Sequence, residues 1–416
     1  MKKEERKKVV AIICEFNPMH TGHLHIISAA KKITSSEFCV GLMSGNFSQR
    51  SEPCVLNKYD RAEIAAKCGM DLVIGLPTAF CTNNAEIFAL SSIKILNELG
   101  VDFLAFGCEI SNEQAFFDLA KFQLSDNKTF KKALKKHLDC GLSYNSSTVR
   151  ALEECKSFFR EENFNDAIQI LQKPNSVLAL EYVKALLRTK SKIRPVFVPR
   201  VDNYNSSNNI ENFVSSSCIR NQLLSTKPKN IEFLPACSHQ FFENYSINFD
   251  LFSTLGLLSI KLKSEKELSQ IYGTGEGLEF KLLNEAKKTN CFQTFFDAAI
   301  SKRYKANRIK AIVLNSQLGI TSKLVKKIYA KNIRIFVKAL AFNSKSSAVL
   351  GCLNTRCVVV RKNDLEKLHF DAFNRALLRV ENNANSLYNI ITKEKQGYNE
   401  NVRMWEDDFV NKVRII

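Results

Sequence analysis

The sequence predicts an α/β fold in which a doubly wound parallel sheet is followed by a mostly α-helical C-terminal domain. In the first third of the chain, short apolar runs alternate with longer amphipathic stretches, which is the pattern of such a sheet. Glycines stand where two of the amphipathic stretches end, as C-caps of helices do. Beyond residue 228 the pattern is mostly helical.

The strands are predicted from runs of four to six residues without polar alternation, which is typical of strands buried on both faces. The runs are residues 9–14, 38–43, 72–76 and 103–106, with a fifth strand at 194–200. Ligands of such sheets bind beyond the carboxyl ends of the strands. We therefore expect His20, Ser44 to Asn46, Pro77 and Gly107, which follow strands, to meet in one crevice.

The helices of the first third are predicted at residues 24–32, 58–68 and 85–99, where Gly69 and Gly100 follow the last two. Residues 116–162 are charged and helical in pattern, with a break at 141–145, and predict an inserted helical pair at about 112–165. We place the domain boundary near Pro228. Residues 1–228 then form the sheet domain, and 229–416 form a basic, mostly helical domain with one strand-like run at 357–360.

The net charge of +18 over 416 residues favours a polyanionic partner. A base composition that enriches lysine everywhere would be an alternative cause. However, residues 298–363 contain fifteen Lys and Arg and no Asp or Glu, and a general enrichment does not empty one stretch of acids. We therefore expect RNA contact in this region, rather than only a solvated basic face.

The thirteen cysteines show no C-x-x-C spacing and no accompanying histidine pair, so they predict neither a disulfide framework nor a structural metal site. Scattered cysteines of this kind act as small apolar residues in a reducing compartment. The apolar run after the basic N-terminus is too short for a signal peptide, and no run reaches the length of a membrane span. The sequence thus predicts a cytoplasmic protein without membrane contact, and no feature indicates a partner protein.

His20-Thr21-Gly22-His23 stands directly between the first predicted strand and the first predicted helix. The N-terminus of a helix offers free backbone N–H groups and a positive dipole end, and two imidazoles add further donors for phosphate. Gly22 has no Cβ, so a base or ribose can approach the backbone, and Asn17-Pro18 makes a rigid turn ahead of it. Two surface histidines in a loop would be the plain alternative, but this position favours a nucleotide phosphate site.

Several motifs in the chain have the order seen in a known family. Glu15-Phe16-Asn17-Pro18-Met19-His20-Thr21-Gly22-His23 resembles the opening motif of the HxGH nucleotidyltransferases and, more narrowly, of the bacterial tRNA(Met) cytidine acetate ligases. The likeness is strong to about residue 110, patchy to 310 and weak beyond. It continues through Met43 to Phe47, Asp71 to Ile74, Phe106 to Glu109, Lys173 to Asn175, Ser216 to Arg220, and Lys302 to Tyr304.

The resemblance implies that residues 1–228 bind ATP and carry catalysis, and that 229–416 bind tRNA. It assigns ATP binding to residues at the ends of predicted elements: Asn17, His20, Gly22, His23, Gly107, Asn175, Arg200 and Ser217. From the residues alone, Gly107 would suit a plain turn, Asn175 the N-cap of a helix at 176–187, and Arg200 a solvated strand end. His20, His23 and Arg220 would stabilise charge in the transition state.

Two further groups of polar residues have weaker patterns. Asn46, Gln49 and Arg50 form a loop after the second strand, where Arg50 suits a small carboxylate. Lys58 and Arg61 fall three residues apart on one predicted helix, and we expect them to face solvent.

A dense basic cluster in the C-terminal half contains Lys302, Arg303, Tyr304, Lys305, Arg308 and Lys310. We expect Lys302, Arg303 and Arg308 to follow an RNA backbone and Tyr304 to stack on an unpaired base, although a place for Tyr304 in a core is the alternative.

The family resemblance implies an ATP-dependent ligase that activates acetate as acetyl-adenylate and acetylates N4 of the wobble cytidine of elongator tRNA(Met). Mg²⁺ is expected alongside ATP, although the sequence offers no carboxylate cluster for it. Two alternatives stay open: a small-molecule adenylyltransferase of cofactor synthesis, and a non-catalytic RNA-binding protein with a relic nucleotide site.

Overall fold

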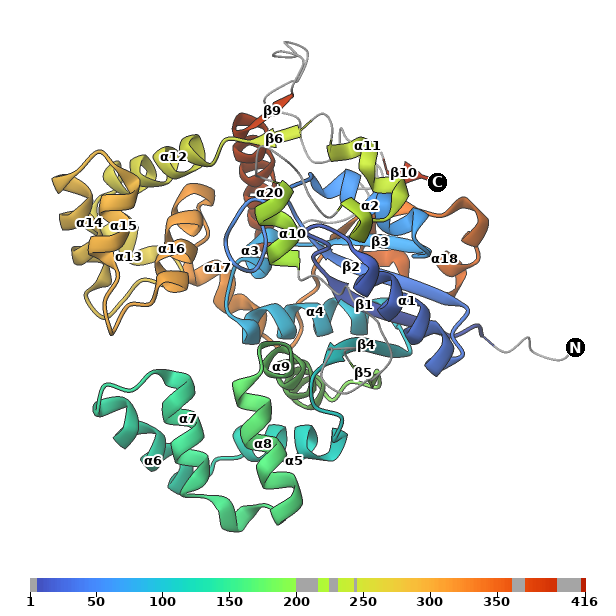
Figure 1. Ribbon diagram of the computed structural model, residues 1–416, viewed down its shortest axis with the longest axis horizontal. Helices are drawn as coiled ribbons and strands as arrows, with labels where there is room; N and C mark the ends of the chain where they lie inside the picture. The colour runs from blue at the N-terminus through green and yellow to red at the C-terminus, as the bar shows by residue number, and fades with distance from the viewer. Residues whose placement is uncertain (1–5, 200–215, 224–230, 243–244, 361–370, 395–412) are drawn as a thin grey trace, which may run out of the picture.

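The computed structural model describes residues 6–199, 216–223, 231–242, 245–360, 371–394 and 413–416. Its centre is a mixed sheet with the strand order β10-β7-β3-β2-β1-β4-β5, in which β8 pairs with β7 (Figure 1). Strands β3, β2, β1, β4 and β5 are all parallel, so their carboxyl ends meet at one edge. The predicted fold class is confirmed.

Strands β1 to β5 agree closely with the apolar runs of the sequence, whereas β7 and β10 were not predicted. They are β1 (Val9–Cys14), β2 (Phe38–Ser44), β3 (Leu72–Leu76), β4 (Phe103–Cys108), β5 (Arg194–Pro199), β7 (Val337–Phe342), β8 (Val358–Val359) and β10 (Arg414–Ile415). A separate ribbon is made by β6 (Tyr245–Ile247) and β9 (Thr392–Glu394). Because almost every residue of β1 to β4 is buried, these strands show no polar alternation.

Helices cover both faces of the sheet. They are α1 (Thr21–Thr34), α2 (Lys58–Lys67), α3 (Thr78–Cys81), α4 (Ala85–Leu99) and α9 (Pro174–Thr189). One core cluster joins α1 and α2 to one face, and another joins α4 and α9 to the opposite face. Gly100 ends α4 with a left-handed φ of 73°, as its position predicted.

The insertion contains four helices rather than the predicted pair. They are α5 (Glu113–Leu124), α6 (Lys128–Asp139), α7 (Tyr144–Glu153) and α8 (Glu161–Gln172), and they form a lobe at one end of the molecule (Figure 1). Asn112, Asn127 and Ser143 each accept a backbone N–H at a new helix start. Ser143 lies in the break predicted at 141–145, whereas the cap at Asn127 divides a stretch that the charge pattern presented as one helix.

Many of the helices after residue 230 lie together in one lobe. A helical lobe at the side of the molecule contains α12 (Phe249–Lys261), α13 (Glu265–Gln270), α14 (Leu278–Lys288), α15 (Phe292–Ala299) and α16 (Ala306–Leu318) (Figure 1). The other helices after residue 230 are α11 (His239–Phe242), α17 (Ser322–Lys326), α18 (Val349–Cys352) and α20 (Ala372–Ile391), and α10 (Ser216–Leu223) precedes them. Among the residues that the structure describes, no helix has both the length and the apolarity needed to cross a bilayer.

Strand β7 returns to the sheet from the C-terminal half and pairs antiparallel with β3. The sequence pattern missed it because Lys338 interrupts the apolar run. The domain boundary near residue 228 stays a prediction. The pairing of β7 with β3 shows that residues 337–342 are part of the sheet.

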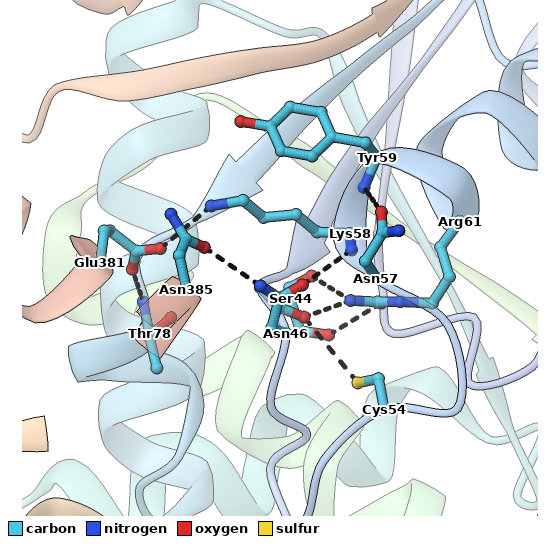
Figure 2. Close-up of polar contacts among 11 residues, drawn as sticks. Ser44, Asn46, Cys54, Asn57, Lys58, Tyr59, Arg61, Thr78, Glu381 and Asn385 are labelled. Carbon is cyan, nitrogen blue, oxygen red and sulfur yellow. Dashed lines mark hydrogen bonds and ion pairs between the residues drawn. The ribbon is translucent and has the colours of Figure 1, made fainter. Parts of the chain in front are cut away.

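The side chain of Arg61 on α2 is buried against the carboxyl ends of two strands. Arg61 is only 1% exposed, and its guanidinium donates to the carbonyls of Glu15, Ser44, Gly45 and Leu56. Figure 2 shows the guanidinium pointing toward Ser44. Lys58, one turn earlier, is 2% exposed. The expectation that both face solvent was wrong, because acceptors from distant strand ends surround them.

We predict that Arg61→Ala lowers the free energy of unfolding by about 3–5 kcal/mol, because it leaves several buried carbonyls without donors. Arg61→Lys should cost less, since an ammonium reaches fewer of these carbonyls. Urea denaturation measures both changes. Arg150→Ala, which removes an exposed arginine on α7, is the matched control, and an equal loss in Arg150→Ala and Arg61→Ala would contradict the role of Arg61.

Candidate active site

The two histidines of the turn cap helix α1 reciprocally. His20 is the N-cap, and its Nδ1 accepts from the backbone N–H of Gly22 at 3.1 Å. The backbone N–H of His20 in turn donates to Nδ1 of His23 at 3.2 Å. The two rings lie with their centroids 3.8 Å apart. The helix start thus fixes both imidazoles side by side.

This capping determines where each neutral imidazole carries its proton. Because Nδ1 of His20 and of His23 accepts a backbone N–H, the ring proton of each neutral histidine lies on Nε2. Both rings can then donate from Nε2 without any change of tautomer. A pair of N–H donors at a helix N-terminus is suited to phosphate oxygens.

Helix α10 meets this turn from a distant part of the sequence. Ser216 Oγ lies 3.0 Å from Nε2 of His20, and a guanidinium nitrogen of Arg220 donates to the carbonyl of Asn17 at 2.6 Å. The peptide bond Asn17-Pro18 is cis. The structure therefore brings together His20, His23 and Arg220, as the motif predicted. Ser216, the first residue of the motif from Ser216 to Arg220, lies with them.

The electrostatics of this turn favour an anion. Burial lowers the pKa of Arg220, the neighbouring positive charge of Arg50 lowers it further, and the carboxylates of Glu15 and Glu52 act in the opposite direction. A triphosphate would bring further negative charge to the two guanidinium groups.

Gly107 and Asn175 lie together at the end of β4. Gly107 is in β4 itself, and Asn175 is in the first turn of α9, where its side chain donates to Glu109 at 2.6 Å. Glu109 also accepts from Ser176, through both its N–H and its hydroxyl. Partial burial acts to raise the pKa of Glu109, but the hydrogen bonds from Ser176 and Asn175 outweigh it and lower the pKa.

Glu109 is therefore the group that caps α9. The alternative that Asn175 is the N-cap of a helix starting at 176 was wrong, because α9 starts at Pro174. Two further predicted residues are not placed. Arg200 lies outside the described residues, and for Ser217 the structure describes the backbone of α10 but not the side chain.

Helix α20 contributes a polar face that sequence analysis missed. Asn385 accepts from Asn46 at 3.0 Å, and the hydroxyl of Tyr388 donates to the carbonyl of Cys54 at 2.7 Å. Glu381 lies 3.5 Å from Lys58 and accepts from the N–H of Thr78 (Figure 2). The spacing of 381, 385 and 388 on one helix face was the only indication of this contact in the sequence.

The predicted RNA-binding residues lie in the helical lobe. Lys302 and Arg303 are exposed just before α16, and Arg303 also lies 3.8 Å from a carboxylate oxygen of Glu276. Arg308 is half-buried, donates to the carbonyl of Gly273 and pairs with Glu276 at 3.1 Å. Tyr304 is only 8% exposed, and its hydroxyl donates to the carbonyl of Glu276. The ring of Tyr304 is thus part of the core and is not available to stack on a base, in line with the alternative given above.

Among the described residues, no group of three His, Cys, Asp or Glu side chains is arranged to hold a metal ion.

Comparison with known proteins agrees with this geometry. The profile of the family described as HIGH Nucleotidyl Transferase matches residues 7–402. A tRNA(Met) cytidine acetate ligase of Alkaliphilus metalliredigens is 33% identical over 359 residues, covering 82% of this chain and 84% of that protein. The chain belongs to the HIGH nucleotidyl transferases, among the tRNA(Met) cytidine acetate ligases.

Other members of the tRNA(Met) cytidine acetate ligase family extend the match. The Clostridium botulinum protein of that name is 31% identical over 421 residues, which is 98% of each chain. The crystal structure of Thermotoga maritima TmcAL bound with alpha-thio ATP has a TM-score of 0.83 at 25% identity, covering 98% of this chain and 99% of that one. The crystal structure of the apo form of the same protein has a TM-score of 0.85. The resemblance seen in the motifs is confirmed.

We predict that His20→Asn weakens ATP binding at least about tenfold while leaving the stability of the fold nearly unchanged. Asparagine is a good N-cap but lacks the second ring nitrogen that faces α10. His20→Ala should weaken ATP binding similarly and also cost about 1 kcal/mol of stability. Calorimetric titration with ATP and thermal melts separate the two effects, and unchanged ATP affinity in His20→Asn would contradict the assignment.

Proposed function

We propose that this protein is an ATP-dependent ligase that activates acetate as acetyl-adenylate and acetylates N4 of the wobble cytidine of elongator tRNA(Met). The observation that carries the proposal is the convergence of His20, His23 and Arg220 on the turn at the N-terminus of α1. The names of the similar ligases and the ATP analogue bound to the similar structure support it.

In the first step an oxygen of acetate attacks the α-phosphorus of ATP, and the bond from that phosphorus to the β-phosphate oxygen breaks. Pyrophosphate leaves and acetyl-adenylate stays. Negative charge increases on the phosphate oxygens in the transition state, where the Nε2–H groups of His20 and His23 and the guanidinium of Arg220 stabilise it. The reaction needs positioning and electrostatics rather than a protein nucleophile.

The adenosine moiety would lie toward Gly107 and Asn175. Both are at the carboxyl end of β4, next to β1 in the sheet, and Glu109 holds Asn175 in place. We include Asn17, Gly22, Arg200 and Ser217 in the ATP site on the family resemblance.

In the second step the N4 amine of the cytidine attacks the acetyl carbonyl, AMP leaves, and the nitrogen loses one proton. The cytidine must leave the anticodon-loop stack to reach the crevice. Lys302 and Arg303 are exposed members of the basic cluster, as Lys305 is, and they would contact the tRNA backbone. Mg²⁺ would enter with the triphosphate. The cytoplasmic location expected from the sequence also stays a prediction.

We predict that acetate stimulates ATP–pyrophosphate exchange by the protein and that His23→Ala lowers this exchange about 10²- to 10³-fold, the usual effect of removing one transition-state donor. Binding of tRNA should persist in the variant. Exchange that requires a nucleotide or a pantetheine compound instead of acetate would support a cofactor adenylyltransferase. Absence of any exchange in the wild type, alongside tight tRNA binding, would support a non-catalytic RNA-binding protein.

We predict that replacing Lys302 and Arg303 together by alanine weakens tRNA binding and reduces the slope of log affinity against log salt by about 1.5, because two phosphate contacts are lost. Filter binding at several salt concentrations measures this slope. Lys132 and Lys135, exposed on α6, make the charge-matched control pair. An unchanged slope in the Lys302 and Arg303 variant would place the tRNA contact elsewhere.

A further inference from the structure

The connection between β2 and α2, residues 45–57, is folded as a narrow hairpin that we call the β2 loop. Its two arms meet in an antiparallel bridge between Phe47 and Pro53. At the tip, the N–H of Ser51 donates to the carbonyl of Ser48 at 2.9 Å, which is the hydrogen bond of a β-turn. The β2 loop therefore ends in a tight turn between these two serines.

Arg50 occupies a central position of this turn. The structure describes the whole β2 loop, and Arg50 is its one exposed residue. Gln49, Glu52 and Asn57 are half-buried, and the rest of the loop is buried. The hairpin thus presents a single exposed cation.

Helices from the C-terminal half hold the arms of the β2 loop. The ring of Phe47 is fully buried and stacks on Phe252 of α12, with the ring centroids 6.0 Å apart. Glu52 pairs with Lys310 of α16 at 2.5 Å. The position of the hairpin is therefore fixed by tertiary contacts, not only by its own short arms.

Two residues just ahead of the histidine turn, residues 20–23, also hold the β2 loop. Glu15 directly follows β1, and its Oε1 accepts from the backbone N–H of Gln49 at 2.6 Å. The side-chain oxygen of Asn17, which is buried, accepts from the N–H of Val55 at 2.9 Å. One contact is at the tip of the hairpin and the other on its returning arm, so both are fixed against the start of the turn.

Arg220 is held by the same short segment, since it donates to the carbonyl of Asn17 at 2.6 Å. Arg50 and Glu15 both act on the pKa of Arg220, in opposite directions, which agrees with their placement beside its guanidinium. Arg220 is half-buried, whereas Arg50 is exposed. The deeper guanidinium suits the inner phosphate of a nucleotide, and the outer one suits the phosphates that follow it.

We propose that Arg50 is a further phosphate-binding residue of the nucleotide site and that Glu15 is the residue that positions it. Glu15 holds the backbone of Gln49, so that the neighbouring guanidinium meets the β- and γ-phosphates of ATP and then the leaving pyrophosphate. AMP lacks both of these groups, so Arg50 distinguishes ATP from AMP. The inference rests on the proposed function, in which a nucleoside triphosphate occupies the histidine turn.

Calorimetric titration of the full-length protein with ATP and with AMP tests the phosphate contact. Arg50→Ala should weaken ATP binding about tenfold or more, the usual effect of losing a charge-assisted hydrogen bond, and should change AMP binding by less than about twofold. Because Arg50 is exposed, the melting temperature should not change. An equal loss of ATP and AMP affinity would overturn the phosphate assignment.

Three variants of glutamate test the positioning role. Glu15→Ala should lose ATP affinity as Arg50→Ala does, whereas Glu15→Gln keeps an acceptor for the N–H of Gln49 and should bind ATP within about threefold of the wild type. Glu37→Ala, which removes an exposed glutamate just before β2, is the matched control and should bind ATP as the wild type does. A loss in Glu15→Gln as large as that in Glu15→Ala would overturn the role of this hydrogen bond.

A double-mutant cycle shows whether Glu15 acts through Arg50. In the Arg50→Ala background, Glu15→Ala should cause little further loss of ATP affinity, because the guanidinium that it positions is already absent. Losses that simply add would overturn the positioning role. If Glu15→Ala does not fold, Glu15→Gln in the same background completes the test, since a further loss there would also show an action independent of Arg50.

Acetate-stimulated exchange separates this inference from the proposed function. If wild-type exchange responds to acetate but Arg50→Ala binds ATP as the wild type does, the inference is wrong and the proposed function stands. A higher KM for acetate with unchanged ATP affinity would assign Arg50 to the carboxylate and also overturn it. If exchange ignores acetate while Arg50→Ala binds ATP weakly and AMP normally, the phosphate contact stands and the proposed function falls.

Discussion

The buried guanidinium of Arg61 is the interaction on which the site depends. It reaches from α2 to carbonyls that follow β1 and β2, so one side chain holds the ends of two neighbouring strands together. The histidine turn continues from the first of these ends, and the loop with Gly45 and Asn46 continues from the second. An ion in a dry interior is stable only when its hydrogen bonds are complete, so the positions of both loops are specified jointly.

Much of the fold could be predicted from local pattern, because buried parallel strands are continuous apolar runs. Strand β7 could not be predicted in this way, because Lys338 interrupts its apolar run. The groups that Lys338 contacts, such as the ring of Tyr59, lie on other elements. Arg61 and Lys58 were placed in solvent for the same kind of reason: their acceptors are strand ends and α20, which are distant in the sequence. The local sequence pattern shows which side chains are polar or apolar, but it does not show which distant residues contact them in the folded protein.

The candidate site shows the same division. The HTGH motif identified the histidines, and the structure adds that their Nδ1 atoms are used by the helix start, which leaves Nε2 for chemistry. Tyr304 is the opposite case, since a basic neighbourhood suggested an RNA contact but the carbonyl of Glu276 holds its hydroxyl inside the lobe. Residues grouped by motif were placed together, whereas residues grouped only by charge were not necessarily accessible.

The antiparallel pairing of β7 with β3 has a consequence for how the chain is made. Until residues 337–342 have been synthesised, β3 is the last strand on its side of the sheet, with a row of backbone N–H and C=O groups open to any other extended chain. The N-terminal part of the sheet therefore leaves the ribosome with an open edge, which a strand from the later part of the same polypeptide must cover.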